Sequence, residues 1–152
     1  MTMRERFAAD LKEAIKARDT RRLSTLRLIT AAIKDRDIAA RTEDNADGVG
    51  EAEILAILAK MIRQRQESAR AYEEGGRLDL AEQEQGEIAV IRDYLPRQMS
   101  ETEVERAIAK AIEETGASSI RDMGKVMAML KERHTGQMDF SRVGATIKQA
   151  FR

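Results

Sequence analysis

The sequence predicts an all-α protein, with a four-helix N-terminal unit followed by a small three-helix C-terminal module. Aromatic residues make up only 3% of the 152 residues and Trp is absent, so the core must be aliphatic. Ala, Leu and Met favour helices, and apolar residues recur at the three-to-four spacing that places them on one helix face. The single proline, Pro96, ends the last helix of the first unit. We therefore expect an N-terminal unit over residues 1–96 and a tail-like module over 97–152.

The N-terminal unit is expected to contain four helices that span residues 2–18, 20–41, 51–74 and about 79–95. Asp19 stands where a side chain can cap the second helix, and Gly75 and Gly76 stop the third. The short turn over 75–78 makes the third and fourth helices antiparallel neighbours. The buried face predicted for the second helix consists of Leu23, Leu26, Leu28, Ile29, Ala31, Ala32 and Ile33.

A loop is predicted over residues 42–50, between the second and third helices. This stretch is acidic and carries Gly48 and Gly50. Such a composition forms turns and hydrated segments and does not build a core.

The C-terminal module is expected to contain three helices, the first of them over residues 101–115. Ser100 and Glu103 form a capping box at its start, and Gly116 follows its end. Ser119 and Asp122 form a second capping box for the next helix, which runs to Gly136. The residues expected to be buried in the second and third helices are Met123, Val126, Met127, Leu130, Val143, Ile147, Ala150 and Phe151, with Phe140 also in the core.

Charge and cysteine content exclude several classes of function. The 27 basic and 27 acidic residues balance, so no overall field attracts a polyanion or a membrane, and any nucleic-acid contact must be local. The absence of Cys removes disulfides, thiolate chemistry and sulfur-ligated metal sites. No signal-peptide-like or membrane-spanning apolar stretch occurs, and a cytoplasmic location is expected.

Six short segments together match a known pattern: residues 16–19, 22–29, 65–68, 76–81, 94–96 and 124–127. Through them the chain resembles the YqeY family, small proteins that share a domain with the C-terminal tail of the B subunit of bacterial Asp-tRNA/Glu-tRNA amidotransferase. The resemblance implies a helical N-terminal unit joined to a helical tail module, and, by analogy with the amidotransferase tail, contact with tRNA. The loop over 136–141 departs from the family pattern because it carries Met138 and Phe140.

The predicted nucleic-acid contacts are four cations of the C-terminal module: Lys125, Lys131, Arg142 and Lys148. With few aromatic side chains for base stacking, such a patch would read RNA shape and backbone and not sequence. Lys131 also lies in a narrow strip with Gly124 and Ala128 at the edge of the apolar helix face, and Gly144 and Lys148 repeat the arrangement. Glycine in such a strip indicates close approach of either a packed helix or a ligand backbone.

No catalytic, cofactor-binding or metal site is predicted. His134 is the only histidine, so a catalytic pair or histidine metal cluster cannot form, and Ser24, Thr25 and Ser68 have no nearby base. The acidic residues over 73–87 lack the histidine partners of bundle carboxylate sites. A cationic row, Arg27, Lys34 and Arg41, recurs at seven-residue spacing on one helix face.

Three functions remain open at the level of sequence. The first is a tRNA-associated binding protein without a catalytic centre of its own. The second is a protein-interaction adaptor that docks a synthetase or amidotransferase subunit through an exposed Met129 and the basic helix face that carries Arg27, Lys34 and Arg41. The third is an accessory to carbon-nitrogen ligation with glutamine as amido donor, which the family resemblance suggests.

Overall fold

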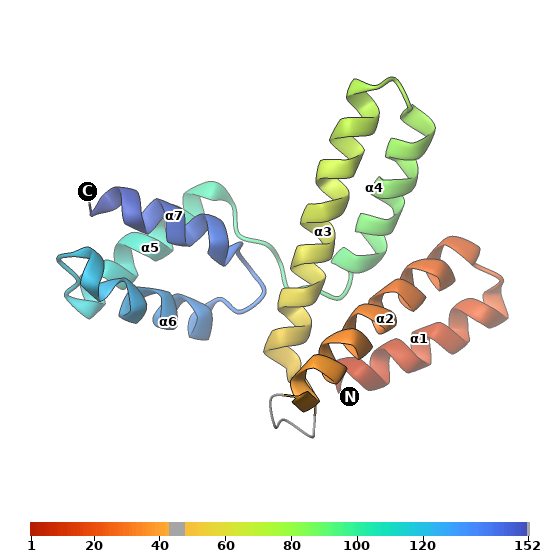
Figure 1. Cartoon of the computed structure of the whole chain (residues 1–152), viewed down its shortest axis with the longest axis horizontal. Coiled ribbons are helices and arrows are strands. Elements are labelled where there is room, and N and C mark those ends of the chain that lie inside the picture. The colour runs from red at the N-terminus through yellow and green to blue at the C-terminus, as the bar shows by residue number, and fades with distance from the viewer. Residues whose placement is uncertain (43–47, 152) are drawn as a thin grey trace. The chain divides into compact units, whose positions relative to one another are not determined.

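The computed structural model describes residues 1–42 and 48–151, and within them it is all-α without a strand, which confirms the predicted class (Figure 1). Contacts along the chain divide it into two compact units, Met1–Leu95 and Pro96–Arg152. The α-helices are α1 Met3–Ala17, α2 Thr20–Thr42, α3 Glu51–Glu74, α4 Leu78–Arg92, α5 Glu101–Thr115, α6 Met123–Arg133 and α7 Phe140–Ala150.

Helix ends in the N-terminal unit are set by short polar side chains and by left-handed residues. Thr2 and Glu5 form a capping box at the start of α1, and Arg18 ends the helix with a φ of 54°. The Asp19 carboxylate accepts a hydrogen bond from the Arg22 amide at 3.2 Å, which confirms its predicted capping role for α2. Gly76 takes a φ of 75° in the turn between α3 and α4, which Figure 1 shows as antiparallel neighbours.

The buried face of α2 differs from the prediction at Leu28 and Ala31. Leu26, Ile29 and Ile33 are buried as expected, whereas Leu28 is 45% exposed and Ala31 is exposed. Residues of a helix are about 100° apart around the axis, so Leu28 lies about 100° from Ile29, outside the buried arc. Thr25 occupies that arc instead, and it is fully buried with its hydroxyl donating to the Arg21 carbonyl at 2.9 Å.

Helix α4 ends at Arg92 and not at residue 95, because the chain tightens before Pro96. The Tyr94 amide donates to the Ile91 carbonyl and the Leu95 amide donates to the Arg92 carbonyl, both at 3.1 Å. This turn brings the Tyr94 ring into the core, where it lies 4.7 Å from the Phe7 ring, centroid to centroid.

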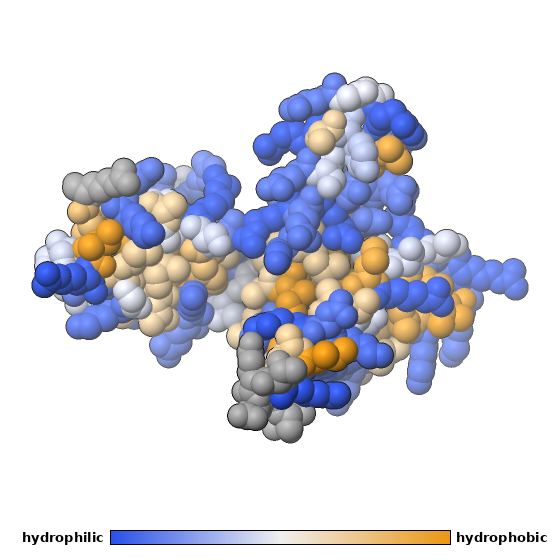
Figure 2. Space-filling model, in the orientation of Figure 1, coloured by the Kyte–Doolittle hydropathy of each residue, from blue (hydrophilic) through white to orange (hydrophobic). Residues whose placement is uncertain are grey.

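The core of the N-terminal unit lies at one end of the α3–α4 hairpin. Ile54, Leu58, Ile88 and Ile91 pack there with residues of α1 and α2. Toward the other end of the hairpin the buried residues are the small Ala69 and Ala81. Figure 2 shows that this outer end of the hairpin is largely hydrophilic.

Asp37 of α2 joins three segments of the N-terminal unit. Its carboxylate accepts two hydrogen bonds from the Arg4 guanidinium, at 2.8 and 2.9 Å, and one from the Val49 amide at 2.9 Å. Arg4 also donates to the Val49 carbonyl at 2.9 Å. Of the predicted loop over 42–50, residues 43–47 lie outside the described residues, and residues 48–50 form neither helix nor strand.

The C-terminal unit begins with the predicted capping box. The Ser100 hydroxyl accepts from the Glu103 amide at 3.2 Å, and the Ser100 amide donates to the Glu103 carboxylate at 3.3 Å. Gly116 ends α5 with a φ of 66°. The second predicted box, formed by Ser119 and Asp122, opens a short 3-10 helix, η1 Ile120–Asp122, and α6 starts directly after it.

The end of α6 and the following loop differ from the prediction. Helix α6 ends at Arg133, and the left-handed Gly136, with a φ of 74°, lies in the turn beyond it. Because α6 ends at Arg133 and α7 begins at Phe140, the loop covers residues 134–139, two residues earlier than expected, and it directs Met138 into the core. Ala150, expected to be buried, is exposed, while Val126, Leu130, Val143 and Ile147 form the core as predicted.

We expect Asp37→Asn to destabilise the chain by about 1 to 2 kcal/mol at pH 7, because it removes a charged acceptor shared by three donors. Hydrogen bonds from Arg4 and Val49 lower the pKa of Asp37 to about 2. The ordinary value is about 3.9, so this contribution is complete above pH 4 or so and is lost as the pH falls toward 2.

Urea unfolding of the two proteins between pH 7 and pH 2 checks this prediction. The gap in unfolding free energy should close in the acid range, whereas Asp35→Asn, on an exposed part of the same helix, should leave stability unchanged. A gap that persists at pH 2 would contradict the prediction.

Candidate nucleic-acid interface

The four predicted cations are all exposed, two on α6 and two on α7. Lys125 and Lys131 belong to α6, and Arg142 and Lys148 belong to α7. Residues six apart on a helix point about 120° away from each other, so neither pair can share one face of its helix. Whether the four form one patch therefore depends on which sides of α6 and α7 meet.

Lys131 and Lys148 both lie along the seam between α6 and α7. Gly144 of α7 is buried, and a Cβ at that residue would lie 3.4 Å from the Met123 Cε of α6, so this side of α7 faces α6. Lys148 follows Gly144 by one turn. On α6 the Arg133 ion pair with Glu114 marks the side that faces α5. Lys131, two residues earlier, points about 160° away from Arg133 and therefore lies on the flank of α6 away from α5.

Arg142 lies on the other flank of α7. It lines an open groove of about 380 Å³ between α5 and α7, together with Glu101, Glu105 and Asp139. The Asp139 carboxylate caps α7 by accepting from the Ser141 amide at 3.0 Å. Three carboxylates around one guanidinium make this groove unfavourable for a phosphate group, and Arg142 is separated from the seam.

Lys125 points away from the core of the C-terminal unit. Its charge contributes to lowering the pKa of Asp122, whose main cause is the hydrogen bond from the Ser118 amide. Lys131 and Lys148 thus lie on the two sides of the α6–α7 seam, each near the C-terminal end of its own helix, and these helices run in opposite directions (Figure 1). Lys125 and Arg142 point away from the seam.

The two glycine strips play different roles. Gly144 lies against Met123, so this glycine allows two helices to pack closely. A Cβ at Gly124, in contrast, would meet no atom of the described residues within 4 Å. Gly124 and Ala128 are exposed, so packing within the unit does not account for Gly124. Met129, expected to be exposed, is half-buried and packs on the C-terminal core.

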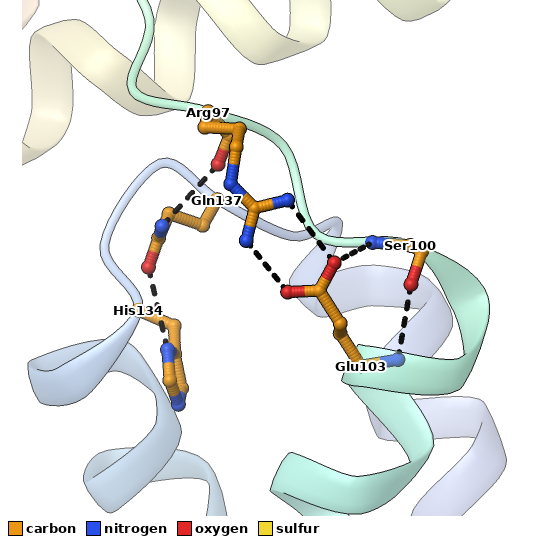
Figure 3. A network of polar contacts seen from close by, with 5 residues as sticks. All are labelled: Arg97, Ser100, Glu103, His134 and Gln137. Atoms are coloured by element: carbon orange, nitrogen blue, oxygen red, sulfur yellow. Dashed lines mark hydrogen bonds and ion pairs between the residues drawn. The ribbon is translucent and has the colours of Figure 1, made fainter.

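A polar network ties the segment before α5 to the turn after α6 (Figure 3). Arg97 pairs with both carboxylate oxygens of Glu103, at 2.7 and 3.1 Å, and the Arg97 carbonyl accepts from the Gln137 side-chain amide at 3.2 Å. The Gln137 amide oxygen lies 3.3 Å from His134 Nδ1. The Arg97 guanidinium, followed by the Ser100 backbone, lowers the pKa of Glu103 to about 2. Of this network, only the capping box was visible in the sequence.

A second groove, of about 410 Å³, lies between α5 and α6, and none of its arginines and lysines was among the predicted contacts. Arg106 and Lys110 line it from α5, and Arg133 and His134 line it from the end of α6. The available signal was the four-residue spacing of Arg106 and Lys110, which places both on one helix face.

Several segments that carried the family resemblance have structural roles in the N-terminal unit. The Tyr94 hydroxyl donates to the Asp10 carboxylate, Arg22 pairs with Asp10 at 3.6 Å, and the Arg6 guanidinium lies 4.6 Å from the Tyr94 ring centroid. Burial and the neighbouring Asp10 raise the pKa of Tyr94 to about 12. This cluster fastens the end of α4 to α1 and α2.

Of the acidic residues over 73–87, Glu84 and Glu87 lie on a half-buried part of α4. Glu87 forms a largely buried ion pair with Arg65 at 3.0 Å, and desolvation, followed by the charge of Glu87, raises the pKa of Glu84. Within residues 1–42 and 48–151 no group of three His, Asp or Glu side chains is placed to hold a metal ion. Over the same residues, every helix is too short or too polar to span a bilayer.

The α2 surface carries both cations and exposed apolar residues. Arg27, Lys34 and Arg41 are exposed, as the seven-residue spacing predicted. Leu28 and Ile38, exposed to 45% and 51%, accompany them on the same helix. This surface is therefore amphipathic and open to solvent.

Comparison with known proteins gives one family and a set of fungal relatives. A family model described as "Yqey-like protein" matches residues 4–151. Proteins named "Altered inheritance of mitochondria protein 41, mitochondrial" are similar to the chain. That of Lachancea thermotolerans is 31% identical over 112 residues, covering 72% of this chain and 58% of the relative. That of Vanderwaltozyma polyspora is 30% identical over 120 residues, covering 75% and 63%.

A third relative, from Pyrenophora tritici-repentis, is 29% identical over 136 residues, covering 84% of this chain and 71% of the relative. The chain spans about six tenths of the length of the first two relatives. The expected cytoplasmic location is contradicted, because these relatives are named as mitochondrial proteins.

We expect Tyr94→Phe to cost about 1 kcal/mol of stability at neutral pH, because Asp10 loses a donor while the ring contacts remain. The folded-state pKa of Tyr94, about 12, lies above the ordinary value, so its contribution is present below pH 10 or so and is lost toward pH 12.

Thermal unfolding of both proteins between pH 7 and pH 11 would show the two curves converging as the pH rises. Tyr72→Phe is the matched control, since the Tyr72 hydroxyl has no hydrogen bond within the described residues. An equal or growing difference at pH 11 would contradict the assignment.

Proposed function

We propose a function from the premise that the chain belongs to the YqeY-like family: it is a tRNA-associated binding protein without a catalytic centre of its own. In this proposal the C-terminal unit contacts the RNA backbone along the α6–α7 seam, with Lys131 and Lys148 as principal contacts and Lys125 as a peripheral one. Arg142 is left out of the proposed contacts because Glu101, Glu105 and Asp139 surround it. One observation carries the proposal. The Lys131 and Lys148 side chains flank one seam, are exposed, and make no hydrogen bond or ion pair with the described residues.

The character of the seam supports backbone contact over base reading. Phe140 and Phe151 are half-buried against the C-terminal core, so they offer no free ring for stacking of a base. Unpaired lysines bind phosphate as point charges and release counterions, which makes such binding sensitive to salt. The exposed Gly124 and Ala128 beside Lys131 leave room for close approach of a sugar-phosphate chain.

A second candidate function is a protein-interaction adaptor for a synthetase or amidotransferase subunit, and the α2 surface favours it. Leu28 and Ile38 are large apolar side chains held in solvent beside Arg27 and Lys34. These two exposed apolar side chains lie about 15 Å apart along α2, each near a cation, and such a surface suits a partner with an acidic rim. The half-buried Met129 no longer belongs to this hypothesis.

We also propose that residues 1–96 and 97–152 are independent folding domains, four helices and three. Each unit has its own cluster of buried apolar residues, the first around Leu26, Leu58 and Ile91, the second around Val126, Leu130 and Ile147. The segment over 97–152 is short for a stable domain, so even the modest contribution of an exposed ion pair in its polar network should be measurable.

A fragment of residues 97–152 is expected to give a cooperative thermal transition by circular dichroism. The same fragment with Arg97→Ala should melt several degrees lower, because Glu103 and the capping box lose their partner. A non-cooperative melt of the unchanged fragment would contradict independent folding.

For the tRNA proposal, full-length protein is expected to bind fluorescent tRNA, with an affinity that falls steeply between 50 and 200 mM salt or so. Lys131→Glu with Lys148→Glu should weaken binding by about tenfold or more, since like charge then opposes the backbone at two contacts.

The matched control is Lys12→Glu with Lys16→Glu, an equal charge change on the exposed side of α1. Absence of tRNA binding at low salt would contradict the tRNA proposal. If the control pair weakens tRNA binding equally, the α6–α7 seam is not the contact surface and the effect is one of non-specific charge. Leu28→Ser with Ile38→Ser should leave tRNA binding unchanged. If the adaptor alternative holds, the same variant should lose the protein partner that the unchanged chain binds.

A further inference from the structure

The groove between α5 and α6 combines an apolar floor with a cationic rim. Ala107 and the buried Leu130 form part of its floor, while Arg106, Lys110, Arg133 and His134 line it. Arg106 and Lys110 follow each other by one turn of α5, which puts their Cβ atoms about 6 Å apart. Both side chains are exposed, so an incoming ligand can reach them.

Ion pairing leaves the groove with an excess of positive charge. The two carboxylates that line it are both occupied, since Glu103 pairs with Arg97 at 2.7 Å and Glu114 pairs with Arg133. Arg106 and Lys110 make no ion pair or side-chain hydrogen bond with the described residues. Lys110 has no ion pair with Glu114, which follows it by one turn of α5 and pairs with Arg133 of α6.

His134 adds a fixed donor or acceptor at the end of the groove. The Gln137 amide nitrogen donates to the Arg97 carbonyl, so the Gln137 oxygen faces His134 and requires a hydrogen on Nδ1. Figure 3 shows the other ring nitrogen, Nε2, directed away from this network. The network therefore holds the imidazole in one orientation, with Nε2 free of partners among the residues drawn.

We propose that this groove binds a phosphate group of an RNA backbone, with Arg106 and Lys110 as the direct contacts. The guanidinium fork of Arg106 matches the paired oxygens of a phosphodiester, and Lys110 supplies a second charge one turn away. The site is distinct from the α6–α7 seam, since Arg133 and Lys131 mark opposite flanks of α6. The inference rests on the proposed tRNA function and adds a second contact to it.

An RNA strand suits this arrangement better than an acidic peptide. A sugar-phosphate chain presents an anion at every nucleotide, so one strand or two adjacent strands can contact both flanks of α6. The groove offers no unpaired backbone edge and only a small apolar floor, which an acidic helix would need for stable docking.

The test compares full-length protein with the variant Arg106→Gln, Lys110→Gln in titrations of fluorescent tRNA at several salt concentrations. We expect about tenfold weaker binding, and a slope of log affinity against log salt that is shallower by about 0.7 to 0.9 for each cation removed from a phosphate. Lys12→Gln with Lys16→Gln is the control, since these lysines are also one exposed turn apart and unpaired. Circular dichroism verifies that all variants are folded.

A second measurement separates the groove from the tRNA function. Amide chemical shifts of the full chain are followed by NMR during addition of inorganic pyrophosphate, and we expect changes around Arg106, Lys110 and His134. If tRNA binds and only the Lys131→Glu, Lys148→Glu variant weakens tRNA binding, the groove inference is contradicted and the proposed function is supported. If tRNA does not bind but pyrophosphate shifts these amides, the proposed function is contradicted and the groove is still a phosphate site.

Two results would overturn the inference outright. One is the absence of shift changes in the groove with either pyrophosphate or tRNA. The other is an equal response of the groove to polyglutamate and to an RNA oligonucleotide at the same charge concentration, which would show that the groove has no preference for a phosphodiester.

Discussion

The carboxylate of Asp37 is the contact on which the arrangement of the N-terminal unit depends. It accepts from Arg4 of α1 and from Val49, which lies just before α3, so one side chain of α2 determines how three segments meet. Gly48 allows the chain to pass close to the Asp37 carboxylate. Its φ is 81°, and a Cβ there would lie 2.5 Å from Asp37 Oδ1, so the chain can pass the carboxylate only without a side chain.

The same principle operates in the C-terminal unit, where polar contacts join the ends of elements. The Gln98 side chain donates to the Gly136 carbonyl at 2.7 Å, and the Met99 amide donates to the Gln137 carbonyl at 3.0 Å, beside the Arg97–Glu103 pair. Aliphatic cores tolerate several packings of similar volume, because Leu, Ile, Val and Met differ little in shape. Directional hydrogen bonds at the helix ends select one of these packings.

Periodicity was sufficient to predict the helices and the centres of their buried faces, as Leu26, Ile29 and Ile33 show. It failed at the edges of those faces, where Leu28 is exposed and Thr25 is buried, since hydroxyl bonding within a helix makes burial of Thr inexpensive. Met138 was missed because loop residues have no period. The Arg106–Lys110 groove was missed for another reason: its charge depends on which carboxylates are already paired, and only three-dimensional contacts determine that.

Because formal charges balance over the chain, recognition of a polyanion must come from cations that internal carboxylates leave unpaired. Ion pairs with carboxylates neutralise four arginines: Arg4, Arg65, Arg97 and Arg133. Four other cations have no ion pair within the described residues: Arg106, Lys110, Lys131 and Lys148. Arg106 and Lys110 of α5 lie to one side of α6, and Lys131 and Lys148 lie to the other, while a helix with its side chains is about 10 Å across. Screening at physiological salt acts over about 8 Å, so the two flanks contribute almost independently. Their effects on binding free energy should therefore add, and the affinity of the unit for a backbone should fall in steps as each flank is neutralised.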